Sequence, residues 1–196
     1  MLRLYDSAPS GNSYKVRLLL AHLGRPYESV PVDVLGDMPD EVIENNPAGR
    51  APMLVLDDGR CLPESNAILF HLAEGTPYLP SDAYRRAQTL QWMFFEQNLH
   101  EPSVAVARFI RHYLAPDHPR AALLPHVMAA GQSALESLER GLAGRTYLVD
   151  ERLSIADFAL YAYTHTAPEG GFDLAPFPAI RAWLARVAAH PRHVPQ

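Results

Sequence analysis

The sequence predicts an α+β domain followed by an all-α domain. Strand-like and helix-like segments alternate over the first 76 residues, whereas from Asp82 onward the apolar residues recur at helical spacing. The run GTPYLP at residues 75–80 interrupts the helical pattern and is typical of a connection between domains. We therefore expect one domain over residues 1–76, a linker over residues 77–83 and a helical domain over residues 84–196.

The N-terminal residues predict a strand, a polar loop and a helix. The strand covers residues 2–5, and residues 6–13 form a loop rich in turn-forming residues. A helix that ends at Gly24 is predicted by an apolar stripe at i, i+3, i+4 and i+7, formed by Val16, Leu19, Leu20 and Leu23. Polar residues thus gather where a helix begins directly after a strand, and such a place favours anions, including a sulfur anion.

A second strand and a short helix are expected next. Val30, Val32 and Val34 alternate with other residues as in a strand, and Pro31 within the run indicates an edge strand. An acidic loop over residues 35–41 leads into a short helix over residues 39–44.

The stretch from residue 46 to residue 74, NPAGRAPMLVLDDGRCLPESNAILFHLAE, predicts a hairpin and a helix. Residues 53–56 and 61–63 form its two strands, because the Asp-Gly pair between them tolerates the positive φ that a tight turn needs. A helix follows, with Ser65 as its expected cap and Ile68, Leu69 and Leu72 as its buried stripe.

The remaining sequence predicts helices. Residues 84–99 and 103–114 form one long helix that is bent at Pro102. Further helices are expected over residues 122–142 and 178–189. Between them, Ser154 and Asp157 have the spacing of a capping box, with Asp in place of Glu, and predict the start of another helix.

The composition excludes several classes of function. The net charge is −5 and no basic block occurs, so nucleic-acid binding is not expected. One cysteine excludes an intramolecular disulfide and fits a reducing compartment, and no apolar run approaches the length of about 20 residues that a membrane span needs. The first residues lack the core of a signal peptide. We expect a soluble, cytoplasmic protein without a membrane partner.

Other catalytic motifs are missing from the sequence. The nine histidines form no H-E-x-x-H pattern, and neither G-x-S-x-G nor a phosphate-binding loop occurs. Cys61 falls within the hairpin rather than at a helix start, which favours an inert thiol. We therefore expect no metal cofactor.

The motifs A-P-x-L, D-G and E-S-N-A-I, at their spacing in residues 51–68, resemble the second half of the thioredoxin-like domain of glutathione transferases. The resemblance extends over nearly the whole chain and implies a thioredoxin-like first domain and an all-helical second domain. It also implies a cis bond between Ala51 and Pro52, with the backbone of Ala51 paired to the cysteine of glutathione. Glu64 and Ser65 are then expected to hold the γ-glutamyl end, because a helix start suits its carboxylate and Glu64 suits its ammonium.

In this family the loop after the first strand activates the thiol. Serine-type members place the activating serine six residues before the apolar residue of the first helical turn, which corresponds to Ser10 in the string S-G-N-S-Y-K-V. Related bacterial enzymes with T-P-N-G or S-P-N-G also use the asparagine, here Asn12. Ser13 and Tyr5 stay open as alternatives, although capping the helix is the more ordinary role for Ser13. The loop has no cysteine, which excludes cysteine-type activation.

Typical interaction free energies are large enough for a hydroxyl to activate the glutathione thiol. A free thiol has a pKa of about 8.5, and lowering it by about two needs about 2.7 kcal/mol. A hydrogen bond to a charged acceptor supplies roughly 1.5–3 kcal/mol, and a helix end adds roughly 0.3–1 kcal/mol. These two contributions suffice to make the thiol mostly thiolate.

Two parts of the expected site depart from the family pattern or depend on spacing alone. Many members carry Lys, His or Gln near residues 35–41 to hold the glycyl carboxylate, whereas this chain has acidic residues there and offers Arg50 instead. Spacing along the long helix suggests an electrophile site lined by Glu101, Val104, Arg108 and His112.

The resemblance implies an enzyme that directs the glutathione thiolate at small hydrophobic electrophiles or peroxides, as in detoxification. A glutathione-dependent disulfide reductase and a non-catalytic interaction module are the alternatives. Family members are usually homodimers, and glutathione is the expected co-substrate.

Overall fold

The computed structural model describes residues 1–33 and 35–196. By their contacts these residues separate into two compact units, Met1–Thr76 with Pro191–Gln196, and Pro77–His190. Residues 77–83, expected as a linker, thus cluster with the second unit, and the last six residues cluster with the first. The predicted strand residue Val34 lies outside the described residues.

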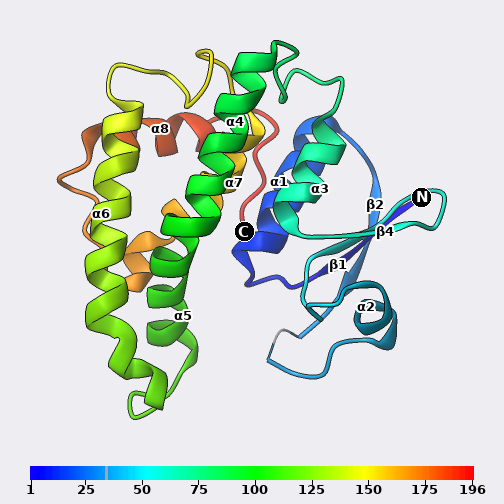
Figure 1. Ribbon diagram of the computed structural model, residues 1–196, viewed down its shortest axis with the longest axis horizontal. Coiled ribbons are helices and arrows are strands. Elements are labelled where there is room, and N and C mark those ends of the chain that lie inside the picture. Colours follow the sequence, from blue (N-terminus) through cyan, green and yellow to red (C-terminus); the bar gives the residue numbers. More distant parts are fainter. Residues whose placement is uncertain (34) are drawn as a thin grey trace. The chain divides into compact units, whose positions relative to one another are not determined.

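The first unit contains a four-stranded sheet with helices on both faces (Figure 1). The sheet order is β2-β1-β3-β4, with β1 and β2 parallel and the other neighbours antiparallel. The elements are β1 (Leu2–Asp6), α1 (Gly11–Leu23), β2 (Tyr27–Pro31), α2 (Asp40–Asn45), β3 (Met53–Val55), β4 (Cys61–Pro63) and α3 (Ser65–Ala73). Pro31 falls in the edge strand β2, as the sequence predicts, because an edge tolerates a missing N–H. Pro63 is the last residue of β4, the other edge strand.

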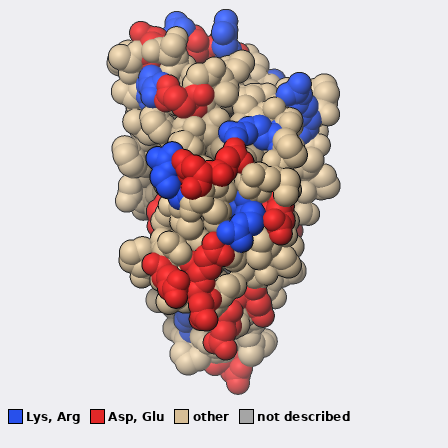
Figure 2. Space-filling model, turned by 90° about the vertical axis from the view of Figure 1, so that its right-hand side faces the viewer, with Lys and Arg blue, Asp and Glu red and all other residues tan. Residues whose placement is uncertain are grey.

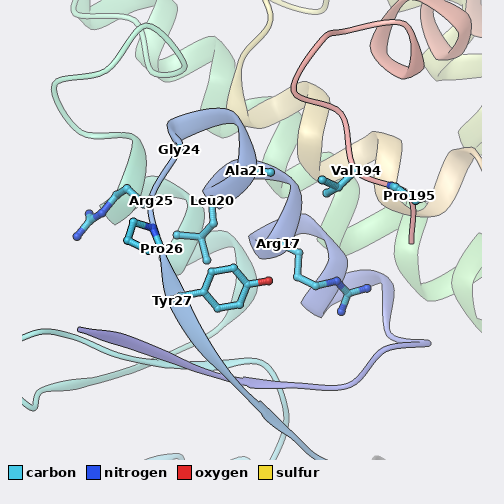
Figure 3. Close-up of a pocket in the computed structure, with 9 residues that line it drawn as sticks. All are labelled: Arg17, Leu20, Ala21, Gly24, Arg25, Pro26, Tyr27, Val194 and Pro195. Atoms are coloured by element: carbon cyan, nitrogen blue, oxygen red, sulfur yellow. The ribbon is translucent and has the colours of Figure 1, made fainter.

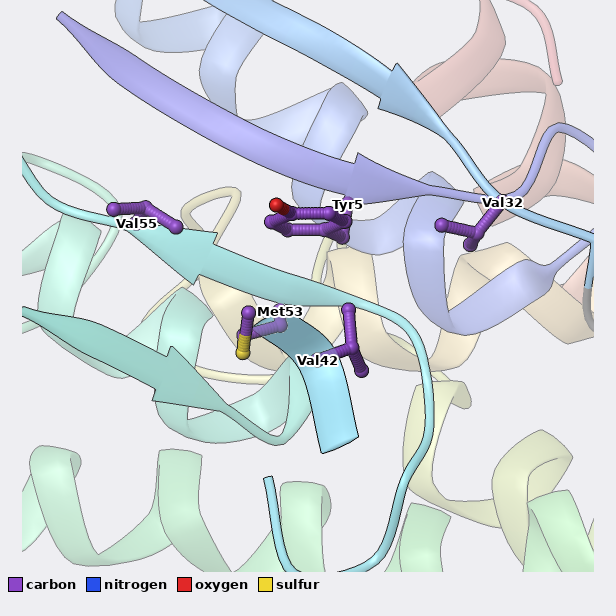
Figure 4. Close-up of a cluster of buried hydrophobic side chains, with 5 residues drawn as sticks. All are labelled: Tyr5, Val32, Val42, Met53 and Val55. Carbon is purple, nitrogen blue, oxygen red and sulfur yellow. The ribbon is translucent and has the colours of Figure 1, made fainter. Parts of the chain in front are cut away.

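The two faces of this sheet are covered by different helices. α1 and α3 pack against each other, and the helix α1 ends at Gly24, whose φ of 63° is the left-handed conformation that glycine adopts without strain. On the other face, α2 contributes Val42 to a buried cluster with Tyr5, Val32, Met53 and Val55 (Figure 4). Tyr5 therefore points to the α2 face of the sheet.

All the named elements of the second unit are helices, and the predicted fold class is confirmed. Its elements are α4 (Ala83–Phe95), a π-helix (Glu96–Ala105), α5 (Val106–Tyr113), a 3-10 turn (Pro119–Leu123), α6 (Leu124–Leu142), α7 (Ile155–Thr164), a second 3-10 turn (Ala167–Gly170) and α8 (Pro178–Ala188). Pro102 lies inside the π-helix, which joins α4 to α5 and is the expected irregularity in the long helix.

Every residue of α7 is buried, so this helix forms the centre of the second unit. The predicted capping box starts it: Asp157 accepts from the backbone N–H of Ser154 at 2.9 Å, and the side chain of Ser154 also caps. Asp157 further accepts from the indole N–H of Trp183 at 3.0 Å, which ties α8 to the start of α7. The capping-box prediction is confirmed.

Candidate functional site

Three loops of the first unit converge at one edge of its sheet. In the pairing of β1 with β3, Tyr5 lies opposite Met53, and in the pairing of β3 with β4, Met53 lies opposite Pro63. The segments that follow β1, precede β3 and follow β4 are therefore neighbours in space. These segments hold the residues that the sequence suggests for glutathione, namely Ser10, Asn12, Arg50, Ala51, Pro52, Glu64 and Ser65.

Ser10 caps the N-terminus of α1. Its backbone is extended, with φ of −77° and ψ of 122°, and its Oγ accepts a hydrogen bond from the N–H of Ser13 at 3.3 Å. The expectation that Ser13 caps this helix is wrong, because the cap lies three residues earlier. A hydroxyl has two lone pairs and one hydrogen, so Ser10 can accept this bond and still donate to another group.

The two alternative hydroxyls, of Ser13 and Tyr5, have other surroundings. Ser13 is fully buried, and its Oγ accepts from the N–H of Ser7 at 3.2 Å. Tyr5 is buried on the α2 face, where its hydroxyl donates to the carboxylate of Glu41. That hydrogen bond raises the pKa of Tyr5, so its hydroxyl stays protonated and engaged. Ser10 is the better placed of the three to meet a ligand at this edge.

Asn12 links the starts of α1 and α3. Its Oδ1 accepts from Nζ of Lys15 at 2.7 Å and from Oγ of Ser65 at 3.0 Å. The second bond joins residues that are 53 positions apart in the sequence. The structure thus brings together the two segments that the sequence suggests for the thiol and for the γ-glutamyl end.

The start of α3 has a strained backbone. Glu64 is the N-cap residue, with φ of 71° and ψ of 111°, and its side chain makes no capping hydrogen bond in the described structure. A positive φ at a residue other than glycine costs about 1–3 kcal/mol and is found mostly at functional sites. Ser65 is the first residue of the helix rather than its cap, which corrects the prediction, because its hydroxyl donates to Asn12 instead. An N-terminus that lacks a side-chain cap suits an anionic ligand.

The segment before β3 is held by a buried asparagine. The Nδ2 of Asn46 donates to the carbonyl of Arg50 at 2.7 Å, and its Oδ1 accepts from the N–H of Ala48 at 3.0 Å. The Ala51–Pro52 bond is cis, as the resemblance implies. Arg50 is exposed, and within residues 1–33 and 35–196 no group pairs with its guanidinium.

Acidic side chains predominate in α2, the helix that precedes this segment in the sequence. Figure 2 shows Asp and Glu in excess of Lys and Arg over the lower part of the face it displays. The sequence of α2 carries Asp40, Glu41 and Glu44, of which Glu41 pairs with Arg3 at 2.8 Å. Arg50 is therefore the available cation near the cis bond, and no basic residue lies in α2 itself.

Two family models match most of the chain. Residues 4–78 match the family model "Glutathione S-transferase, N-terminal domain", and residues 103–191 match "Glutathione S-transferase, C-terminal domain". The chain belongs to the glutathione S-transferase family. The predicted architecture, a thioredoxin-like domain and an all-helical domain, is that of glutathione transferases and is confirmed.

Proteins similar to this chain carry the names of different enzymes. The chain is 30% identical to the disulfide-bond oxidoreductase YfcG of Escherichia coli (strain K12), with 97% of this chain and 92% of that protein covered. It is 30% identical, over 97% of this chain and 92% of that protein, to maleylacetoacetate isomerase of Pseudomonas aeruginosa. A crystal structure of a glutathione S-transferase from Pseudomonas fluorescens Pf-5 is 50% identical, with a TM-score of 0.95 and coverage of 99% and 98%.

The four residues suggested for the electrophile site of this glutathione transferase family member lie along the π-helix and α5. Val104 is 1% exposed, and Glu101 is half-buried and accepts from Gln97 at 2.7 Å. Arg108 donates to the carboxylate of Glu169 at 2.6 Å, and His112 is exposed and packs edge-on against Tyr113. Val104 is thus part of the packing of the helical unit, and Arg108 is held in an ion pair. Their role toward an electrophile stays a prediction.

Neither a metal cluster nor a membrane span emerges from the described part of this transferase-family chain. Among residues 1–33 and 35–196, no group of three or more His, Cys, Asp or Glu side chains lies close enough to hold a metal ion. In the same residues, no helix is both long and apolar enough to cross a membrane.

Several contacts within the first unit could not be predicted from a sequence motif. Arg17 forms an ion pair with Asp6 and donates to the carbonyl of Ala8 at 3.0 Å, which fastens the loop before Ser10 to α1. The C-terminal tail binds α1 through Tyr14, whose hydroxyl donates to the carbonyl of Val194 at 2.7 Å.

Beside this tail lies a cavity of about 670 Å³ (Figure 3). Its lining comes from α1, the start of β2 and the tail: Arg17, Leu20, Ala21, Gly24, Arg25, Pro26, Tyr27, Val194 and Pro195. None of the residues suggested for glutathione lines this cavity. They lie instead in the three loops at the edge of the sheet described above, which form the candidate site.

Proposed function

We propose that this chain is a glutathione transferase that holds the glutathione thiol as a thiolate and directs it at small hydrophobic electrophiles or peroxides. Ser10 donates a hydrogen bond to the sulfur, and Asn12 supplies a second donor. The N-terminus of α1 adds a favourable potential for the anion. The resulting thiolate is the nucleophile, so neither a metal nor a covalent enzyme intermediate is needed.

The other loops at the sheet edge bind the rest of the tripeptide. The backbone of Ala51, before Pro52, pairs with the cysteinyl residue of glutathione as a neighbouring strand would. Glu64 and the first turn of α3, including Ser65, bind the γ-glutamyl ammonium and carboxylate. Arg50 holds the glycyl carboxylate in place of the Lys, His or Gln of other members.

One observation carries this proposal. The hydrogen bond between Asn12 and Ser65, at 3.0 Å, joins the start of α1 to the start of α3, two helix ends that both favour negative charge. Glutathione has a sulfur that can ionise and a carboxylate at its γ-glutamyl end, and the two neighbouring helix starts suit both groups. The family membership of the chain supports the same substrate.

The test is conjugation of glutathione to an activated aryl halide by the wild type, Ser10→Ala and Asn12→Ala. Ser133→Ala is a matched control, because Ser133 is exposed on α6 in the other unit. We expect both loop variants to lose turnover and the control to keep it. Failure of the wild type to bind glutathione at millimolar concentration by calorimetry would show that the proposal is wrong.

A glutathione-dependent disulfide reductase is the second candidate. The name of the Escherichia coli relative, a disulfide-bond oxidoreductase, favours it, as does the pairing of Ser10 with Asn12 in the loop. Activity on a glutathione mixed disulfide, together with inactivity toward aryl halides and peroxides, would select this candidate.

A non-catalytic role is the remaining alternative. It is motivated by the acidic α2 region, where other members bind the glycyl carboxylate with Lys, His or Gln. We further propose a cytoplasmic homodimer with a detoxifying role, on the pattern of the family. Sedimentation at micromolar concentration tests the dimer, and a single species with the mass of one chain would exclude it.

A further inference from the structure

The chain uses arginine almost everywhere for positive charge, with one exception. It contains sixteen arginines and one lysine, Lys15. This lysine is 0% exposed, whereas no arginine is among the buried residues of the described chain. A buried ammonium loses its hydration, so its position needs hydrogen-bond acceptors that replace water.

Lys15 fixes which way the amide of Asn12 faces. Its Nζ lies 2.7 Å from Oδ1 of Asn12, and an ammonium only donates hydrogen bonds. The oxygen of the amide must therefore face Lys15, where it also accepts from Ser65 at 3.0 Å. The NH₂ group of Asn12 is consequently directed away from both of these donors.

We propose that Lys15 is a positioning residue that keeps Asn12 a hydrogen-bond donor toward the sulfur of glutathione. The inference rests on the proposed function and adds a residue that touches neither the sulfur nor the electrophile. Its physical basis is the near symmetry of an amide, in which oxygen and nitrogen can exchange places by rotation about χ2. Lys15 makes one of the two orientations strongly preferred.

Loss of Lys15 removes one of the contacts that set this preference. Ser65 can accept as well as donate, so it tolerates either end of the amide. In the flipped orientation Asn12 presents its carbonyl oxygen to the thiolate, and a donor is replaced by a repelling acceptor. Losing one hydrogen bond to a charged group corresponds to roughly a 10- to 100-fold loss.

The test is a double-mutant cycle with Lys15→Met and Asn12→Ala, using glutathione and an activated aryl halide. Lys15→Met keeps a side chain of similar length but removes the donor. We expect it to raise the pKa of the bound thiol and to lower kcat/KM at pH 7 by roughly 10- to 100-fold. In the Asn12→Ala background the same substitution should have little further effect, because the amide it orients is gone.

An equal loss in both backgrounds would overturn the inference, since Lys15 would then act independently of Asn12. Unchanged thiol pKa in Lys15→Met would overturn it too. If the wild type itself neither binds nor uses glutathione, the proposed function fails and the inference with it. A wild type that does both, paired with an additive cycle, refutes the positioning role alone.

Three further tests keep the inference falsifiable if Lys15→Met does not fold. Lys15→Gln retains an N–H donor and should restore part of the activity, and Asn12→Asp keeps both contacts to the oxygen while removing the NH₂. We expect Asn12→Asp to lose activity although Lys15 stays bound. Lysine-selective isotope labelling gives one NMR signal, because the chain has one lysine. That signal should move in Asn12→Ala, and a signal that stays in place would contradict the contact.

Discussion

Ser10 has one observed role, the cap of α1, and one proposed role toward the thiolate, and substitutions can separate them. Its Oγ accepts from the N–H of Ser13 at 3.3 Å and so caps α1, while its hydroxyl hydrogen is the proposed donor to the thiolate. Ser10→Ala removes both. Ser10→Asp keeps an acceptor for the cap but has no hydrogen to donate and carries a negative charge at pH 7. Ser10→Thr keeps both functions.

The expected magnitudes differ for the two tasks. Loss of the cap costs roughly 0.5–2 kcal/mol of unfolding free energy, so Ser10→Ala is destabilised and Ser10→Asp is not. Loss of a hydrogen bond to a charged acceptor costs roughly 1.5–3 kcal/mol, which corresponds to a rise of about 1–2 in the thiol pKa. Both Ser10→Ala and Ser10→Asp should therefore lose thiolate at pH 7, although only one loses stability.

Two assays resolve the tasks. Chemical denaturation gives the unfolding free energy, and ultraviolet absorbance of the thiolate, recorded against pH with bound glutathione, gives the thiol pKa. Ser10→Thr should resemble the wild type in both. A wild-type thiol pKa in Ser10→Asp would refute the donor role, and wild-type stability in Ser10→Ala would refute the cap.

Three other substitutions test the structure elsewhere. Burial raises the pKa of Asp157 to about 6 from 3.8, so between these values the folded chain holds a proton that the unfolded chain releases. The unfolding free energy should fall by about 3 kcal/mol as the pH rises through that window and stay level above it; a wild-type profile no steeper than that of Asp157→Asn would contradict this. Glu64→Gly should gain about 1 kcal/mol of stability because glycine adopts the φ of 71° freely, yet bind glutathione more weakly in calorimetry; unchanged affinity would remove Glu64 from the site. Tyr14→Phe should lose about 1 kcal/mol with its bond to Val194, and an unshifted denaturation midpoint would argue against the tail contact.

Elements with local determinants could be predicted from the sequence. The capping box at Ser154 and Asp157 follows from two side chains three residues apart, and the structure forms it. The hairpin of β3 and β4 follows from an Asp-Gly turn between two short apolar runs. The stop of α1 at Gly24 follows from a residue that adopts positive φ. In each case neighbouring residues in the sequence make the contacts that define the element.

Features that depend on tertiary contacts could not be predicted in this way. Serine is a common capping residue, but the hydroxyl of Ser65 donates to Asn12, which lies 53 positions away in the sequence. Glu64 adopts a positive φ that its residue type does not favour. The C-terminal tail has no periodic pattern, and it joins the first unit through Tyr14, a residue of the first helix. The identity of the proposed electrophile could not be predicted either, because apolar residues around such a site carry little chemical information.

A crystal structure with bound glutathione tests the central claim most directly. We predict that the sulfur lies within hydrogen-bonding distance of Oγ of Ser10, that the backbone of Ala51 pairs with the cysteinyl residue, and that the γ-glutamyl carboxylate meets the start of α3. A tripeptide bound away from this edge of the sheet, or a sulfur that contacts neither Ser10 nor Asn12, would contradict the account.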